Sequence, residues 1–158
     1  MDSSSITPFV QSTSNVFEMM LQLPVTVGKP ELKKEPEPAH DVSGIIGLSG
    51  DIEGLVVVSF PTSTAERAVS LFTGETLEAT NPDFADAIGE LVNMISGGAK
   101  AQFEGKSIQI SVPSVVVGTG HTVFGKKDMK GVTIPCSCDI GEFSVEVSMV
   151  EWVNATAA

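Results

Sequence analysis

Glu90 and Asn93 are the two side chains of this sequence whose types and spacing indicate chemistry. Residues three apart on a helix are surface neighbours, so a carboxylate and an amide at this spacing would face the same partner. A carboxylate accepts hydrogen bonds and pairs with cations, whereas an amide both donates and accepts, so it can orient a water molecule without titrating. The same spacing also arises by chance, and its surroundings must therefore decide what it means.

Residues 82–104 have the features of an amphipathic helix that would present this pair. Asn81 is a suitable N-cap, and Pro82 suits the first helical position. The apolar residues recur at helical spacing and predict one buried face: Ile88, Leu91, Val92, Ile95 and Ala99. Glu90 and Asn93 fall away from the middle of that face, which predicts that both are exposed.

The sequence also holds a control for this spacing. Glu78 and Asn81 are three residues apart as well, but Asn81 directly precedes Pro82. A proline disfavours the helical conformation at the residue before it, so this second pair is not expected to share a helical face.

Residues 87–98 read AIGELVNMISGG. This stretch closely resembles the signature helix of the CheC/CheX/FliY phosphatases of bacterial chemotaxis, and the single-site CheX type fits best. The similarity continues upstream in residues 45–54 and downstream in residues 113–118, so it covers nearly the whole chain.

The resemblance implies that the chain hydrolyses the aspartyl phosphate of a CheY-like response regulator in chemotaxis signalling. It implies that Asn93 orients the attacking water and that Glu90 engages a lysine of the regulator. Such hydrolysis depends mainly on a water placed in line and on stabilisation of charge. Asp86, Gly97 and Gly98 are expected to contact the regulator. Mg²⁺ would belong to the regulator, and no cofactor or metal is expected on this chain.

Three small residues follow the pair: Ser96, Gly97 and Gly98. A surface that lacks side chains lets the backbone of a partner approach closely. Alternatively, these residues loosen the helix or pack it against a neighbouring strand. Both interpretations remain open on the sequence alone.

The remaining patterns predict an α+β fold, a mostly antiparallel sheet covered by helices, in a single domain over residues 1–158. In chain order they indicate a helix at 6–23, a Pro-rich surface connector at 24–41, a hairpin at 42–60, a helix from Pro61 to Phe72 with Ser63 or Thr64 as its cap, and the helix from residue 82 to about Gly105. Strands are expected at 107–118, at 120–134 with a break near residues 125–128, and at 142–152.

Two segments predict a diverged internal repeat. Residues 48–52 (LSGDI) and 136–140 (CSCDI) occupy similar places between strands. This similarity indicates that a unit of one helix followed by strands occurs twice in the chain. The resemblance implies such a repeat as well, and two-site relatives carry a second Glu/Asn pair on their first helix. Here the nearest candidate is Ser12 with Asn15, which lacks the carboxylate, so a single active site is expected.

Charge and hydropathy narrow the possible partners. The 158 residues include 20 acidic and 9 basic side chains, which gives a net charge of −11 and disfavours nucleic acid and anionic membranes. There is no apolar stretch of about 18 residues that could span a membrane. Asp2 stands where a signal peptide would carry positive charge, so a cytoplasmic protein is expected. The resemblance further implies a homodimer.

Other motifs carry less weight. Residues 120–127 nearly spell a phosphate-binding loop, but Lys127 stands where such a loop needs Ser or Thr. Cys136 and Cys138 lack the second Cys/His pair of a zinc site, and His40 and His121 are isolated.

Two alternative functions stay open. One is a non-catalytic regulator-binding or flagellar-motor-associated module that keeps the fold, and the other is a phosphatase for a regulator outside chemotaxis. The presence of both Glu90 and Asn93 favours an enzyme over a binding module.

Overall fold

The computed structural model describes residues 3–33, 38–126, 129 and 131–151, so Lys127 and the expected strand end at residue 152 lie outside the described part. Its helices are α1 (Ser3–Val16), the π-helix η1 that continues it (Phe17–Leu21), α2 (Thr62–Thr73) and α3 (Pro82–Lys100). Its strands are β1 (Thr26–Val27), β2 (Glu31–Lys33), β3 (Val42–Gly50), β4 (Ile52–Phe60), β5 (Ile108–Ile110), β6 (Ser114–Val117), β7 (Gly131–Cys138) and β8 (Gly141–Glu151).

The strands form one antiparallel sheet in the order β1-β7-β8-β4-β3-β5, with β2 also on β7 and β6 also on β3. Two long hairpins, β3–β4 and β7–β8, meet at its centre, where β4 pairs with β8 from Ile52↔Glu151 to Ser59↔Ser144. α1 precedes the first hairpin and α3 precedes the second. The α+β prediction is confirmed, and the order of elements is the one expected for a helix-plus-hairpin unit taken twice.

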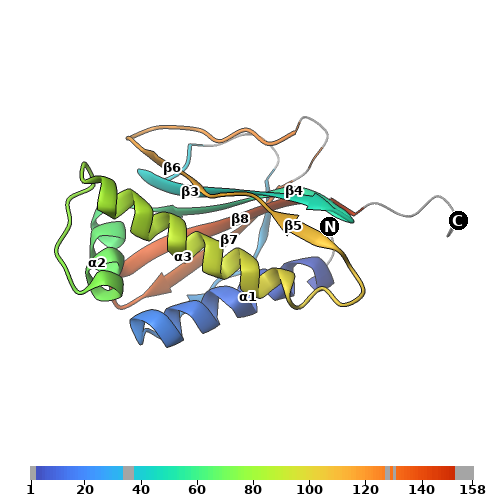
Figure 1. The fold of residues 1–158 in the computed structure, drawn as a ribbon, viewed down its shortest axis with the longest axis horizontal. Coiled ribbons are helices and arrows are strands. Elements are labelled where there is room, and N and C mark those ends of the chain that lie inside the picture. Colours follow the sequence, from blue (N-terminus) through green and yellow to red (C-terminus); the bar gives the residue numbers. More distant parts are fainter. Residues whose placement is uncertain (1–2, 34–37, 127–128, 130, 152–158) are drawn as a thin grey trace, which may run out of the picture.

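The three α-helices lie on one side of the sheet (Figure 1). Alternate residues of a strand point to the same face, so every second residue of the central strands enters the core. Val56, Val58 and Val147 are fully buried there. Phe143 of β8 stacks on Phe17 of η1, with ring centroids 4.6 Å apart and planes 5° from parallel.

Gly44 of β3 lies where α3 packs tightly on the sheet. A Cβ atom at Gly44 would lie 2.3 Å from Cγ2 of Val92, which is too close for any side chain. Val92 belongs to the apolar face that the sequence predicts for this helix. Because this face is held against β3, the opposite face of α3 is turned toward solvent.

α2 begins at Thr62, close to its predicted start, but its cap differs from the prediction. The side chains of Ser63 and Thr64 do not cap the helix. Instead, Oδ2 of Asp41 accepts hydrogen bonds from both the backbone N–H and the hydroxyl of Thr62, each 3.1 Å long. Gly74 ends the helix as predicted, with a φ of 75°.

The predicted connector 24–41 contains two short strands, β1 and β2, which pair with β7 at one edge of the sheet. Both are edge strands, and the described prolines Pro24, Pro30 and Pro38 lie outside them. Proline has no N–H to donate, so no ladder hydrogen bond is lost at these positions.

Two strand predictions need correction. The strand expected at 107–118 is divided into β5 and β6, both on β3, and Pro113, which has no N–H to donate, lies in the gap. The strand expected at 120–134 is wrong in its first part, since the described residues 120–126 and 129 contain no strand.

The segment after β6 is tied to the sheet face that the α-helices leave uncovered. Nε2 of His121 lies 2.7 Å from the hydroxyl of Ser43, and its Nδ1 lies 2.7 Å from the carbonyl oxygen of Gly118. Ser43 in turn is 3.1 Å from the hydroxyl of Ser59. His121 is thus not isolated, since both of its ring nitrogens have hydrogen-bond partners. Among the described helices, none is long and apolar enough to cross a membrane.

Candidate functional site

α3 positions the predicted site residues. Oδ1 of Asn81 accepts a 2.9 Å hydrogen bond from the N–H of Asp83, which confirms the predicted N-cap. The helix ends at Lys100 instead of near Gly105. Its buried residues include the whole predicted apolar face: Phe84, Ala87, Ile88, Gly89, Leu91, Val92, Ile95, Ser96 and Ala99.

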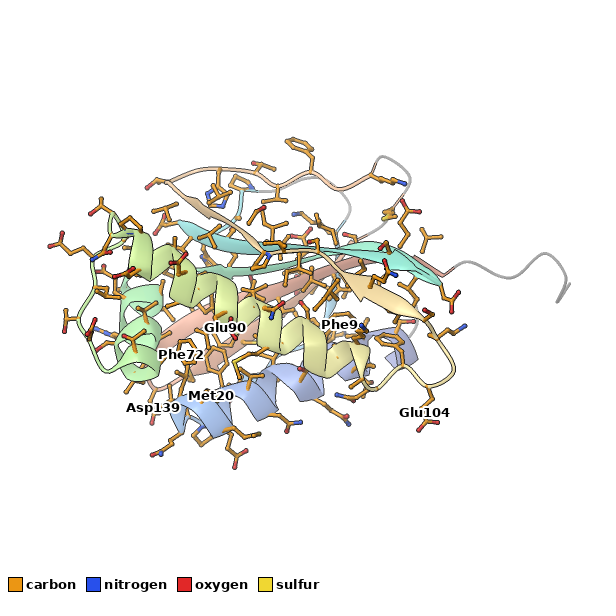
Figure 2. All side chains as sticks on the ribbon, in the orientation of Figure 1. Phe9, Met20, Phe72, Glu90, Glu104 and Asp139 are labelled. Carbon is orange, nitrogen blue, oxygen red and sulfur yellow. The ribbon has the colours of Figure 1, made fainter. Side chains whose placement is uncertain are left out.

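Glu90 is exposed and Asn93 is half-buried, so the predicted exposure holds for Glu90 and only in part for Asn93. Figure 2 shows Glu90 on α3. Neither side chain has a hydrogen-bond or ion-pair partner among the described residues. The carboxylate of Glu90 and the amide of Asn93 are therefore free to bind a partner or to orient water. Asp86 is exposed one turn before Glu90.

Pro113 supports the helix behind Glu90. A Cβ atom at Gly89 would lie 3.3 Å from Cγ of Pro113 and 3.6 Å from Cγ2 of Val115. A Cβ atom here would require Pro113 or this turn of α3 to shift by a few tenths of an ångström. Gly89 therefore lets α3 pack closely on this part of the sheet edge.

A groove of about 470 Å³ runs between α3 and the continuous helix formed by α1 and η1. Asn93 lies in its wall. The residues that line it share one property, since none is charged: Ser12, Asn15, Val16, Met19, Met20, Asn93, Met94, Gly97, Gly98 and Gln102. The sequence did not reveal this groove, because it forms between helices far apart in the chain. In the sequence, only the adjacent apolar residues Met19 and Met20 could have indicated such a surface.

Contacts between α1 and α3 fix the groove. The hydroxyl of Ser12 donates a 2.6 Å hydrogen bond to the carbonyl oxygen of Ile95, and Nε2 of Gln102 donates one of 3.3 Å to the carbonyl oxygen of Pro8. Ser12 is buried, whereas Asn15 is exposed at the groove. Both residues line the groove, but the Ser12 hydroxyl is used in helix packing and only Asn15 has an exposed side chain.

The three small residues after Asn93 have three different environments. Ser96 is buried, and its hydroxyl has no partner among the described residues, so it does not belong to a side-chain-free surface. A Cβ atom at Gly98 would lie 2.3 Å from the hydroxyl oxygen of Ser12, so Gly98 allows close packing of α1, a helix and not the strand considered above. A Cβ atom at Gly97 would meet nothing within 4 Å. Gly97 therefore has the most open space of the three, while Gly98, packed against Ser12, also lines the groove.

A second cavity, of about 280 Å³, lies on the other face of the sheet, beside the ion pair between Lys33 and Glu146. None of the exposed residues of α3 lines it. The groove and this cavity are therefore separate. Of the predicted site residues, Asn93, Gly97 and Gly98 line the groove, whereas Asp86 and Glu90 line neither of the two.

The cysteines form no disulfide, and Cys136 is buried. Burial raises the pKa of the Cys136 thiol from its ordinary value to about 12, with a further contribution from the nearby Cys138. Within the described ranges there is no group of three or more His, Cys, Asp or Glu side chains that could hold a metal ion.

Comparison with known proteins gives concordant results. The family model described as "Chemotaxis phosphatase CheX" matches residues 42–137. The CheY-P phosphatase CheX of Thermotoga maritima is 32% identical over 121 residues, which are 75% of this chain and 78% of that protein. The crystal structure of a chemotaxis protein CheX from Desulfovibrio desulfuricans is similar with a TM-score of 0.86 and 34% identity, over 93% of this chain and 99% of that one.

The fold is also similar to that of a chain in the crystal structure of the CheX-CheY-BeF3-Mg²⁺ complex from Borrelia burgdorferi. The TM-score is 0.77 and the identity 24%, over 93% of this chain and 98% of that one. At this identity the similarity concerns the fold.

Proposed function

Because the chain belongs to the CheX family of chemotaxis phosphatases, we propose that it hydrolyses the aspartyl phosphate of a CheY-like response regulator. One observation carries the proposal. α3 buries one face against the sheet and leaves Glu90 and Asn93 on the other without partners among the described residues, beside an uncharged groove. A carboxylate and an amide in this position are suited to a partner that brings its own reactive group.

In the proposed reaction, water attacks the phosphorus atom, the bond between phosphorus and the aspartate oxygen breaks, and inorganic phosphate leaves. The amide of Asn93 holds the water in line, which lowers the entropic part of the barrier. Asparagine suits this role because its donor and acceptor do not change with pH. The carboxylate of Glu90 pairs with a lysine of the regulator and fixes the approach of the phosphoryl group.

The charge on the phosphoryl group would be stabilised mainly by the regulator. We propose that Mg²⁺ binds to the regulator and not to this chain, and the Borrelia burgdorferi complex, which contains CheY and Mg²⁺, is compatible with that division. Asp86, Gly97 and Gly98 are proposed as additional regulator contacts. Gly97 is the best placed of the three, since nothing lies within 4 Å of where its side chain would start.

A homodimer is also proposed. β6 lies at one edge of the sheet, and it carries the partly exposed Val116 and Val117. An edge strand presents unpaired backbone groups that a second chain can use. Analytical ultracentrifugation across a range of concentrations tests this, and a monomer at every concentration would contradict it.

The test of the function is the decay of a phosphorylated CheY-like regulator from the same organism, in Mg²⁺, with and without this protein. We expect the protein to accelerate decay catalytically, with many turnovers per molecule. Binding without acceleration would instead indicate a non-catalytic module. Absence of both binding and acceleration, with every CheY-like regulator of the organism, would contradict the proposal.

A further inference from the structure

We propose that the groove between η1 and α3 receives an apolar surface of the regulator that lies next to its phosphoaspartate, and that Met19 and Met20 set the affinity of this contact. The inference rests on the proposed function, since the regulator is the partner. It adds a docking surface, on a different helix, to the polar pair on α3.

The two methionines are exposed for a structural reason. Met19 is 78% exposed and Met20 is 37% exposed. They lie within η1, whose flanking residues Phe17 and Leu21 are buried, and Phe17 is stacked on Phe143. The π-helical turn is therefore anchored on both sides while its middle residues point outward. Single π-helical turns of this kind are frequent at functional sites.

The position of Asn93 identifies what covers the groove. Asn93 and both methionines line the same groove, and Figure 2 shows Met20 at the end of the first helix, below the part of α3 that carries Glu90. A regulator that brings its phosphoryl group to Asn93 must therefore cover the groove. Its surface there has to replace the water that now contacts Met19 and Met20.

Charge supports the same occupant. The chain has a net charge of −11, which repels an anionic ligand, but the lining of the groove carries no charged side chain. On the side of the groove, therefore, no carboxylate repels an acyl phosphate that approaches Asn93, while Glu90, on the same helix, is proposed to pair with a lysine of the regulator. Methionine adds adaptable apolar contact, because its unbranched side chain fits surfaces of varied shape.

The test replaces Met19 and Met20 together by Gln, which keeps side-chain length and removes the apolar end. Leu71→Gln is the matched control, because Leu71 is 49% exposed on another helix and lies outside the groove. Two quantities are measured with one CheY-like regulator. These are the Kd for its BeF3⁻-treated form, which mimics the phosphorylated state, and the KM and kcat for its dephosphorylation.

We expect the double variant to raise both Kd and KM about 10-fold, which corresponds to about 1.4 kcal/mol, and to leave kcat within twofold. Leu71→Gln should change none of them. An unchanged Kd in the double variant, with wild-type oligomeric state, would overturn the inference. The inference would also be overturned if the double variant dissociated a dimer but bound the regulator with an unchanged Kd, since the groove would then bind a second copy of this chain.

The two proposals fail in different ways. If the wild-type protein binds the BeF3⁻-treated regulator but does not accelerate decay, the proposed function is wrong, while the Kd values still test the groove. If the double variant keeps the wild-type Kd and KM, the groove inference is wrong and the phosphatase function stands. If the wild-type protein binds no CheY-like regulator, both are wrong.

Discussion

Ser12 of α1 donates a buried 2.6 Å hydrogen bond to the carbonyl oxygen of Ile95 in α3. Ser12 stands where a second Glu/Asn pair on the first helix would need its carboxylate. In this chain that position holds two helices together, and the Glu/Asn pair lies on α3. The same contact fixes the width of the groove beside Asn93.

Gly98→Ala tests this contact between the helices. The new Cβ atom would lie 2.3 Å from the Ser12 hydroxyl oxygen, so α1 and α3 must separate. We expect the free energy of unfolding to fall by about 1–3 kcal/mol, as for other overpacked sites. Gly97→Ala is the control. It meets nothing within 4 Å and should gain about 0.5–1 kcal/mol from the higher helix propensity of alanine. Urea unfolding measures the free energy of unfolding of both variants. Equal changes in the two variants would contradict the packing role of Gly98.

Asn93→Ala tests the residue that is proposed to orient the water. We expect the rate of phosphoregulator decay at saturating protein to fall about 100-fold, or about 2.7 kcal/mol of barrier. The free energy of unfolding should change by less than about 0.5 kcal/mol, because the side chain has no partner among the described residues. Single-turnover decay measures the first quantity and urea unfolding the second. A wild-type rate would remove Asn93 from the mechanism.

Glu90→Gln tests the proposed ion pair with the regulator. Removal of the charge should raise KM about 10-fold, or about 1.4 kcal/mol, with a smaller effect on kcat. The difference from wild type should shrink as salt is added, because exposed charges are screened. Glu78→Gln is the control, since Glu78 is also exposed and also three residues before an Asn, but it precedes the helix. If both variants behave alike, the effect is one of general charge and not of a specific contact.

The raised pKa of the buried Cys136 thiol predicts how the free energy of unfolding depends on pH in the alkaline range. The unfolded thiol titrates near its ordinary pKa of 9.0, whereas the pKa in the folded state is raised to about 12. Between these values the folded state keeps a proton that the unfolded state loses, so the free energy of unfolding falls as pH rises above 9. The contribution is at most about 1.4 kcal/mol per pH unit.

Urea unfolding at several pH values, of wild type and Cys136→Ala, measures this contribution as a difference between the two slopes. The variant should lose less stability than the wild type as pH rises from 8 to 10, although it starts from a lower value because a buried side chain has been shortened. Parallel curves would show that Cys136 is not protonated as described.

The sequence predicted the elements that local patterns determine. The apolar period and the N-cap of α3 identified the helix, and with it the exposure of Glu90. The β3–β4 hairpin followed from its apolar strands and glycine-containing turn. Each of these features depends on residues close together in the chain.

Features that depend on distant contacts were not predicted. The cap of α2 comes from Asp41, and the described residues 118–126 after β6 are held to the sheet by His121 and Ser43 instead of forming a strand. The groove required α1 to pack against α3 through Ser12 and Gly98, residues whose types do not indicate such a contact. In the site, the sequence thus identified the polar pair but not the apolar surface beside it.

The central pairing of β4 with β8 also decides when the chain can fold. Val56 pairs with Val147, so the middle of the sheet stays open until the last described strand has been synthesised. Closing such a long loop is entropically costly, and folds dominated by distant pairings form slowly. During synthesis, at about 5–20 residues per second, β4 presents an unpaired apolar edge for several seconds. Nascent chains are therefore most vulnerable to aggregation just before β8 emerges from the ribosome.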